Sequence, residues 1–368
     1  MRIRLVGPVH PYKGGIAQHT TQLSHRLAAA GHDTAVESWR RQYPESIYPG
    51  QQRVDSAEVE PFDRTRYRLS WNSPLSWVLM GRRLRSEADL VVIVLVSPVQ
   101  VPPYLVALAA LGRHRAPRVV VLAHNVLPHE RGPLDRLAVR RLMRHADEVL
   151  VHSQGQRDLA KTLTTAPIVV RPLAPHLPTG SLAEPPPAIP QRHLLFFGLV
   201  RRYKGVDLLV RALADVPDAT LTIAGEFWRG ADEVYEAIEE AGVGDRVELR
   251  PGYVPADDIP ALFARTDALV LPYREATATQ NVALAFSYGR PVVATTAGTL
   301  PGLVRDGVDG LLCPPDDVAA LAATLRRLYE PGVWRHLVDG VAAVDEDAPW
   351  KAYIEALVGT GGEAPHGR

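Results

Sequence analysis

The residues with the clearest chemical potential lie in the run Gly198-Leu-Val-Arg-Arg-Tyr-Lys-Gly205, which holds three cations between two glycines. The apolar stretch 193–197 before it is typical of a buried strand, and helical periodicity begins at about Val206. A strand, a basic loop and a helix N-terminus in this order can form an anion site, because backbone N–H groups, the helix dipole, Arg201 and Lys204 all face one place. A basic turn exposed to water would have the same sequence, so this loop alone does not decide between the two.

A second loop, early in the chain, contains Gly14 and Gly15 directly before a predicted helix over 16–30. Paired glycines at a helix N-terminus let a phosphate group approach the backbone closely. The pair is a weak indication by itself, since an ordinary strand–helix turn accounts for it equally well. The spacing is not that of the GxGxxG fingerprint, which disfavours a dinucleotide-dependent dehydrogenase.

A third loop begins at His124, at the end of a predicted strand over 118–124. A single histidine in such a place is more often structural. Asn125, His129 and Glu130 follow closely, however, which favours hydrogen bonds to a polar ligand. We expect no metal here, because the spacing provides no facing triad of ligands.

A fourth loop runs from Tyr273 to Asn281 and leads into a predicted helix over 282–288. The first N–H groups of a helix have no partner within the helix. Thr277 or Thr279 could cap them, which would be a purely structural role. In the functional interpretation, the hydroxyl and amide groups of this loop hold sugar hydroxyls or phosphate.

The composition predicts a globular protein of two domains. The chain has 368 residues, of which 46% are hydrophobic and 22% charged, and this length exceeds one ordinary core. Residues 1–175 contain 24 Lys and Arg against 14 Asp and Glu, a net of +10, which the remainder offsets to a net charge of zero. A basic first half suits an anionic membrane surface or a phosphorylated acceptor, whereas nucleic acid is disfavoured because no basic stripe is interleaved with aromatic residues.

The location that we expect is cytoplasmic, with a peripheral position at the inner face of the membrane as the alternative. The only cysteine, Cys313, excludes an internal disulfide and fits a reducing compartment. It has no histidine or cysteine at ligand spacing, and we expect it to be a small buried residue. No signal peptide is recognisable in the sequence.

An α/β framework must position these loops, because short apolar runs alternate with helical periodicity through nearly the whole sequence. The polar stretch 40–75 is expected to be an irregular insertion, and the Pro-rich stretch 173–190 a semi-rigid linker. We therefore predict two Rossmann-like parallel-sheet domains, 1–172 and 191–345, that face a cleft, since ligands of open α/β sheets bind outside the carboxyl ends of the strands. The expected strands are 2–6, 34–37, 90–96, 118–124, 148–153 and 168–171 in the first domain, and 193–197, 220–224, 246–250, 268–271, 291–295 and 310–313 in the second.

Over most of its length the chain resembles the retaining nucleotide-sugar glycosyltransferases of family 4, which have the GT-B fold. The motifs that carry this resemblance are Gly14-Gly15-Ile16, the loop from Gly198 to Gly205, Gly289-Arg-Pro-Val-Val-Ala-Thr, and Asp306-Gly-Val-Asp-Gly-Leu-Leu-Cys-Pro-Pro-Asp316. Trp350 and the helix after it, about 350–360, look like the final family helix that returns to the N-terminal domain. The order and spacing of these motifs are more specific than any one of them.

The resemblance implies catalytic roles for His124, Arg201, Lys204 and Glu275, with His124 at the position of the family's donor-sugar histidine. It places a UDP- or GDP-linked sugar against a further set of residues: Gly14, Gly15, Gly198, Glu226, Tyr253, Ala276, Thr277, Thr279 and Gln280. It also implies front-face displacement without an essential divalent ion or other cofactor. The acceptor would be a lipid-linked saccharide, a polysaccharide precursor or a natural product.

The chain departs from the family pattern at three positions. Ala276 and Leu284 stand where the family usually has two glutamates, the second of which holds the ribose, and Leu199 replaces the usual arginine after the loop glycine. Arg201 could take over the contact of that arginine. Two alternatives therefore stay open: a catalytically inactive GT-B subunit that binds a nucleotide sugar, and a GT-B sugar-nucleotide epimerase.

Overall fold

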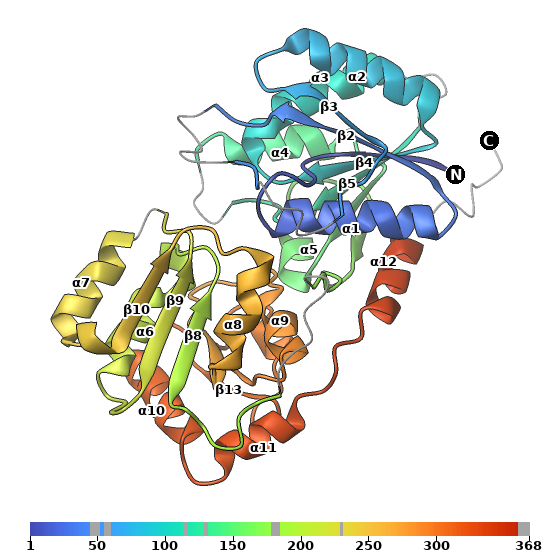
Figure 1. Cartoon of the computed structure of the whole chain (residues 1–368). Coiled ribbons are helices and arrows are strands. Elements are labelled where there is room, and N and C mark those ends of the chain that lie inside the picture. The colour runs from blue at the N-terminus through green and yellow to red at the C-terminus, as the bar shows by residue number, and fades with distance from the viewer. Residues whose placement is uncertain are drawn as a thin grey trace. The chain divides into compact units, whose positions relative to one another are not determined.

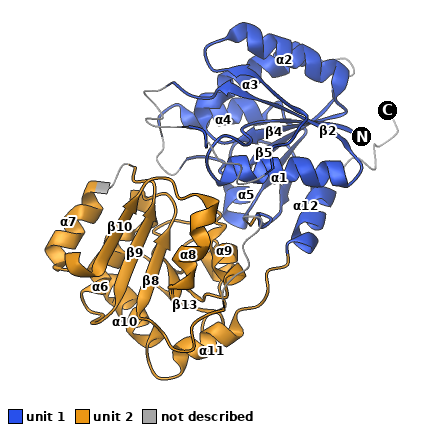
Figure 2. Cartoon of the chain, in the orientation of Figure 1, with its two compact units in different colours: residues 1–176, 346–368 blue, residues 177–345 orange. Residues whose placement is uncertain are grey.

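The computed structural model describes residues 1–44, 52–54, 60–112, 117–128, 132–177, 185–228 and 231–359. The chain forms two compact units (Figure 2): unit 1 comprises Met1–His176 and Glu346–Arg368, and unit 2 comprises Leu177–Asp345. Each unit is built on one parallel β-sheet covered by helices (Figure 1), which confirms the predicted architecture of two parallel-sheet α/β domains. Part of the predicted linker, residues 178–184, lies outside the described ranges.

Unit 1 has a seven-stranded sheet in the order β3-β2-β1-β4-β5-β6-β7. Its central strand, β4, has the sequence LVVIVL and is buried along its whole length, as expected for a strand with helices on both faces. The strands are β1 (Arg2–Val6), β2 (Asp33–Arg41), β3 (Thr65–Ser70), β4 (Leu90–Leu95), β5 (Arg118–Ala123), β6 (Glu148–Val151) and β7 (Ile168–Val170). The helices are α1 (Gly15–Ala29), α2 (Pro74–Glu87), α3 (Val101–Leu111), α4 (Asp135–Met143), α5 (Gln154–Lys161) and α12 (Asp347–Gly359).

Two apolar cores cover the two faces of this sheet. One contains side chains from α2, α3, α4 and α5, and the other contains side chains from α1 and α12. Trp350 of α12 is only 1% exposed, and its indole N–H donates to the carbonyl of Pro175 at 2.7 Å. The C-terminal helix is thereby an integral part of unit 1.

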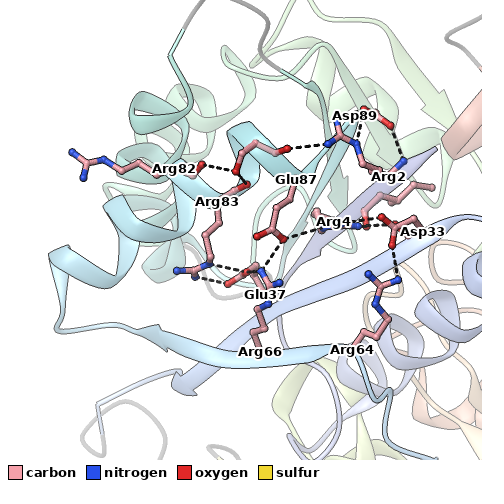
Figure 3. A network of polar contacts seen from close by, with 12 residues as sticks. Arg2, Arg4, Asp33, Glu37, Arg64, Arg66, Arg82, Arg83, Glu87 and Asp89 are labelled. Carbon is pink, nitrogen blue, oxygen red and sulfur yellow. Dashed lines mark hydrogen bonds and ion pairs between the residues drawn. The ribbon is translucent and has the colours of Figure 1, made fainter.

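The expectation of an irregular insertion over 40–75 is wrong for part of that stretch. β2 extends to Arg41, and residues 65–70 form the edge strand β3. Figure 3 shows the network of ion pairs around this edge, in which the nearly buried Glu37 accepts from Arg66 at 3.3 Å and from Arg83 at 2.6 Å. Arg66 of β3 pairs with the nearly buried Glu37 and with the half-buried Glu87. The strand has the sequence TRYRLS and so lacks the apolar pattern by which the others are predicted.

Unit 2 has a six-stranded parallel sheet in the order β10-β9-β8-β11-β12-β13. Its strands are β8 (His193–Phe197), β9 (Thr220–Gly225), β10 (Val247–Pro251), β11 (Ala268–Leu271), β12 (Val292–Thr295) and β13 (Gly310–Cys313). Its helices are α6 (Val206–Leu213), α7 (Ala231–Ala241), α8 (Ile259–Ala264), α9 (Asn281–Ser287), α10 (Val318–Leu328) and α11 (Val333–Gly340).

Two further expectations concern single features of the chain. Cys313 is 2% exposed within the core of unit 2, which confirms its role as a small buried residue. None of the helices in the described ranges is both long and apolar enough to cross a bilayer.

Candidate functional site

The basic loop of unit 2 joins β8 to α6 and is shaped by its two glycines. Gly198 has φ 111° and Gly205 has φ 64°, both in the region that favours glycine. A Cβ atom on Gly205 would lie 2.0 Å from the carbonyl oxygen of Pro272, so no other residue fits. The loop is therefore held tightly against the end of β11.

Two cations of this loop are held by aromatic rings. The Lys204 ammonium donates to the Tyr273 hydroxyl at 2.7 Å and lies 4.1 Å from the centre of that ring. The Arg201 guanidinium lies 4.7 Å from the ring centre of Trp228. Burial lowers the pKa of Lys204, and the positive charge of Arg201 lowers it further. Two cations close enough to repel each other favour an anionic ligand, and no described carboxylate forms an ion pair with Lys204.

An arginine outside this loop, Arg274, holds the loop in place. Its guanidinium donates to both carboxylate oxygens of Asp207 at 2.8 Å and to Asp316 at 2.8 Å. It also donates to the carbonyl of Arg202 at 2.6 Å, and its own backbone N–H donates to the carbonyl of Tyr203 at 2.8 Å. Its charge is thus neutralised, and its role is to fix the backbone that carries Arg201 and Lys204.

The loop from Tyr273 to Asn281 contacts the same region. Asn281 donates to the carbonyl of Phe197 at 2.7 Å and to the Tyr273 hydroxyl at 3.4 Å, so Tyr273 contacts both Lys204 and Asn281. The Thr279 hydroxyl accepts from the Asn281 N–H at 3.2 Å, which matches the capping alternative for this residue. Ala276 packs against Gly298, where a Cβ atom would lie 1.7 Å from the Ala276 carbonyl oxygen.

The predicted donor-binding residues of unit 2 follow neighbouring strands. Gly198 follows β8, Glu226 follows β9, Tyr253 comes shortly after β10, and the loop with Glu275, Ala276, Thr277, Thr279 and Gln280 follows β11. Because the sheet is parallel, all of these residues lie at its carboxyl edge. Leu284 is only 6% exposed and belongs to the apolar core, and its side chain has no polar group with which to hydrogen-bond a ribose.

In unit 1, Gly14 and Gly15 form the start of α1. Gly14 precedes the helix with φ 98°, and a Cβ atom there would meet no neighbour within 4 Å. A Cβ atom on Gly15 would lie 3.8 Å from Nε2 of His176. This glycine loop therefore adjoins a group of buried histidines.

His124 is one of these histidines. It follows β5, is 6% exposed, and has its ring centre 4.9 Å from that of His19 and 4.8 Å from that of His152. Burial lowers the pKa of His124 well below its usual value, and the neighbouring histidines lower it further. His124 is therefore a neutral ring at neutral pH. Two residues predicted to act with it, His129 and Glu130, lie outside the described ranges.

The prediction from sequence missed several residues that build these sites. Arg274, Asp207 and Asn281 fix the loops of unit 2, and His19, His152 and His176 surround His124 in unit 1. The described ranges contain no group of three or more His, Cys, Asp or Glu side chains arranged to hold a metal ion.

Two family models match the chain. The one described as "Glycosyl transferases group 1" matches residues 191–331, and the one described as "Glycosyl transferase 4-like domain" matches residues 14–175. Together the two matches cover the sheet of unit 2, the sheet of unit 1 except β1, and the loops that contain Gly14, His124, Lys204 and Glu275.

Curated relatives are similar over part of their length. A D-inositol 3-phosphate glycosyltransferase of Catenulispora acidiphila is 32% identical over 149 residues, which make up 37% of this chain and 35% of the relative. A 2-deoxystreptamine glucosyltransferase of Streptomyces kanamyceticus is 32% identical over 139 residues, with the same shares of 37% and 35%. The matched stretches thus span about a third of the length of these relatives.

Solved structures share the fold over almost the whole chain. HepE of Anabaena, in complex with UDP and glucose, has a TM-score of 0.73 at 17% identity, and the match covers 98% of this chain and 100% of HepE. The lipopolysaccharide outer core galactosyltransferase WaaB has a TM-score of 0.71 at 16% identity, with 98% and 100% covered. This similarity confirms the predicted class of fold.

Proposed function

Because the chain belongs to the family 4 glycosyltransferases, with the GT-B fold, we propose that it is a retaining enzyme that transfers a sugar from a nucleoside diphosphate sugar to an acceptor. The observation that carries this proposal is the pair of cations, Arg201 and Lys204, on a loop that Arg274 and Tyr273 hold rigid. Rigid, partly desolvated cations are suited to stabilise charge that develops on a leaving group.

The chemistry follows from the leaving group. As the bond from the anomeric carbon to the phosphate oxygen breaks, the electron pair of that bond goes to the diphosphate. Arg201 and Lys204 would stabilise this charge, and the leaving phosphate would take the proton of the acceptor hydroxyl as the new bond forms on the same face of the sugar. Such a mechanism needs neither a pair of carboxylates of the glycosidase kind nor a divalent ion.

We propose a UDP-sugar as the first candidate donor and a GDP-sugar as the second. Three of the solved neighbours are complexes of HepE with UDP, with UDP-glucose, or with UDP and glucose. The test is a panel of nucleotide sugars, in which the right donor raises the melting temperature by binding only folded protein and releases free nucleoside diphosphate. Excess EDTA should leave this release unchanged, and a loss that only Mg²⁺ or Mn²⁺ reverses would contradict the metal-free mechanism.

The acceptor is proposed to bind unit 1. By their names, two curated relatives act on inositol 3-phosphate and on 2-deoxystreptamine, which are small polyhydroxylated rings. The net charge of +10 over residues 1–175 would favour a phosphorylated ring over an aminocyclitol, or an acceptor carried by an anionic membrane. A competition assay that compares inositol phosphate, an aminocyclitol and a lipid-linked saccharide as acceptors separates these classes.

A second candidate is an inactive subunit that binds a nucleotide sugar without turning it over. The buried Leu284, at the position of the family's ribose-binding glutamate, is the observation that favours it. Donor binding in the thermal assay without any release of nucleoside diphosphate, with every acceptor class supplied, would support this candidate against the enzyme.

A further inference from the structure

Four buried histidines meet in the interior of unit 1. His19 is 0% exposed, His124 6%, His152 4% and His176 8%. His19 comes from α1, whereas the other three come from the segments that follow β5, β6 and β7. Trp350 and Tyr353 of α12 close the cluster, with the Trp350 ring stacked on His19 at 5.0 Å and the Tyr353 ring stacked on His152 at 6.0 Å.

The register of the sheet places two of these histidines and one carbonyl in a row. Ala123 pairs with Val151, and Val151 pairs with Val170, across three neighbouring parallel strands. The residues that follow these three in the sequence therefore lie side by side, and they are His124, His152 and Arg171. Nδ1 of His152 lies 3.1 Å from the carbonyl oxygen of Arg171, and Nε2 of His152 lies 3.2 Å from Nδ1 of His124.

This row determines where the hydrogen atoms are. A carbonyl oxygen can only accept, so Nδ1 of His152 must carry a hydrogen and donate it to Arg171. Burial lowers the pKa of His152 to about 4, so at neutral pH its Nε2 has a lone pair and accepts. The donor to that lone pair must be Nδ1 of His124. Since burial also keeps His124 neutral, its one remaining nitrogen, Nε2, carries no hydrogen.

Nε2 of His124 has no hydrogen-bond partner within the described residues, although it is fully buried. An unsatisfied buried acceptor of this kind destabilises the fold, and a ligand hydroxyl that donated to it would remove this cost. The loop with Gly14 and Gly15 adjoins the same cluster through the contact of Gly15 with His176. A ligand on that loop would therefore lie beside the histidines.

We propose that His152 is a positioning residue that fixes His124 in the tautomer with a bare Nε2, so that His124 can only accept a hydrogen bond from a hydroxyl group of the donor sugar. The identity of that hydroxyl as part of a nucleotide sugar rests on the proposed function. The tautomer itself does not, because it follows from contacts within unit 1. His152 touches only His124 and the backbone in this row, and it acts on the sugar through His124.

Two substitutions separate positioning from packing. In His152→Gln the side-chain amide can donate to the Arg171 carbonyl, and its oxygen can accept from Nδ1 of His124, which keeps the row intact. In His152→Leu the volume is kept and both hydrogen bonds are lost. Circular dichroism and melting temperature establish that each variant is folded.

The first measurement is the tautomer of each histidine, read from ¹⁵N chemical shifts of the whole chain labelled on histidine, at pH 7.5 without any nucleotide. We expect a protonated Nδ1 and a bare Nε2 for His124 in the wild type and in His152→Gln, and a mixture of tautomers in His152→Leu. A wild-type His124 that carries its hydrogen on Nε2, or that is cationic, would overturn the proposal whatever the enzyme does.

The second measurement is the release of UDP from UDP-glucose and from its 2-, 3-, 4- and 6-deoxy analogues. With UDP-glucose, we expect His152→Leu to lower kcat/KM by about 10- to 100-fold, which is the loss typical for residues that orient metal-binding histidines. His152→Gln should keep most of the wild-type kcat/KM. With one of the deoxy analogues, the wild type and His152→Leu should have nearly equal kcat/KM, because this donor lacks the hydroxyl group from which His124 accepts. An equal loss on all five donors would mean that His152 only supports the fold and would overturn the proposal.

These two measurements also separate this inference from the proposed function. If the wild type releases no nucleoside diphosphate from UDP-glucose or from any donor of the panel, the proposed enzyme activity fails. The ¹⁵N shifts of His152→Gln and His152→Leu still show whether His152 sets the tautomer of His124.

Discussion

The three cations of the basic loop differ in what surrounds them. Lys204 contacts Tyr273, and Arg201 lies over Trp228, whereas the exposed Arg202 lies 3.5 Å from the carboxylate of Glu233. The sequence predicts all three as a basic run, because side-chain partners from distant segments leave no local pattern. From this run the sequence indicates Arg201 and Lys204 as the anion-binding residues, and the structure adds that both contact aromatic rings whereas Arg202 forms a surface ion pair.

At the residue scale, we predict that Arg201→Ala and Lys204→Ala each lower kcat by roughly 10²–10³-fold, as for removal of a group that stabilises developing negative charge. Arg202→Ala is the matched control on the same loop, and it should keep kcat close to that of the wild type. The measurement is nucleoside diphosphate release at saturating donor. Wild-type turnover in the first two variants, or an equal loss in all three, would contradict the assignment of the loop.

At the scale of elements, Arg274 links three segments of unit 2. It pairs with Asp207 on α6, with Asp316 after β13, and with the backbone at Arg202. Burial alone would raise the pKa of Asp207, but Arg274 and Arg211 more than offset this effect and lower it. The carboxylate of Asp207 is thus charged and nearly buried, and it depends on Arg274 for its compensation.

We predict that Arg274→Ala lowers the free energy of unfolding of unit 2 by roughly 3 kcal/mol, because it leaves the charge of Asp207 without its closest partner. The double variant Arg274→Ala with Asp207→Asn should recover part of this loss, since no uncompensated charge remains. Urea unfolding followed by tryptophan fluorescence measures both. If Asp207→Asn lowers the free energy of unfolding by the same amount in Arg274→Ala as in the wild type, the two residues are not coupled.

The helices α2 and α4 of unit 1 carry exposed apolar side chains beside arginines. Leu75 is 68% exposed and Leu79 42%, and with Arg82 they lie on one face of α2. Leu137 of α4 is 57% exposed and has Arg140 and Arg144 on its face. Both helices belong to the layer that contains α3 (Figure 1). Exposed leucines bordered by arginines suit the surface of an anionic bilayer.

We predict that the protein sediments with vesicles that contain an anionic lipid but not with neutral vesicles. Each arginine near such a surface contributes about 1 kcal/mol, and high salt should weaken binding because it screens the attraction. Leu75→Gln with Leu79→Gln should weaken binding at constant charge, whereas Arg327→Gln in unit 2 serves as a charge control. Indifference to both kinds of vesicle would favour a small soluble acceptor.

At the scale of the whole molecule, the buried histidines make stability depend on pH. Burial lowers the pKa of His152 and of His176 to about 4, and lowers those of His19 and His124 as well. In the unfolded chain these groups titrate at about 6.5. Below that pH the unfolded state therefore binds more protons than the folded state, and stability is lost as the pH falls from 6.5 toward 4.

We predict that the melting temperature of unit 1 falls between pH 6.5 and pH 5, where carboxylates are still largely ionised. His19→Phe should weaken this dependence while changing little at pH 7.5, because neither nitrogen of His19 has a hydrogen-bond partner among the described residues. Calorimetry of both proteins across this range measures the difference. A decline of the same size in His19→Phe would show that His19 does not contribute to it.

The order of elements was largely predictable, and the contacts between elements were not. β4 is a continuous run of valine, leucine and isoleucine, and β5 contains four such residues in a row, so their burial is visible in the sequence. β3 was missed because its sequence, TRYRLS, has no apolar run, and because Arg66 pairs with Glu37 and Glu87, which come from elsewhere in the chain. For the same reason His124 could be chosen as a site residue, but His19, His152 and His176 could not be assigned to it.

The place of α12 in unit 1 has a consequence for synthesis on the ribosome. Unit 2 is one continuous stretch, so the ribosome has synthesised all of its residues once it has added Asp345. Unit 1 must wait longer, because Trp350 and Tyr353, which close its histidine cluster, come after the whole of unit 2. The unit that is translated first is therefore the unit that is completed last, and its apolar face under α12 stays uncovered until α12 has been synthesised.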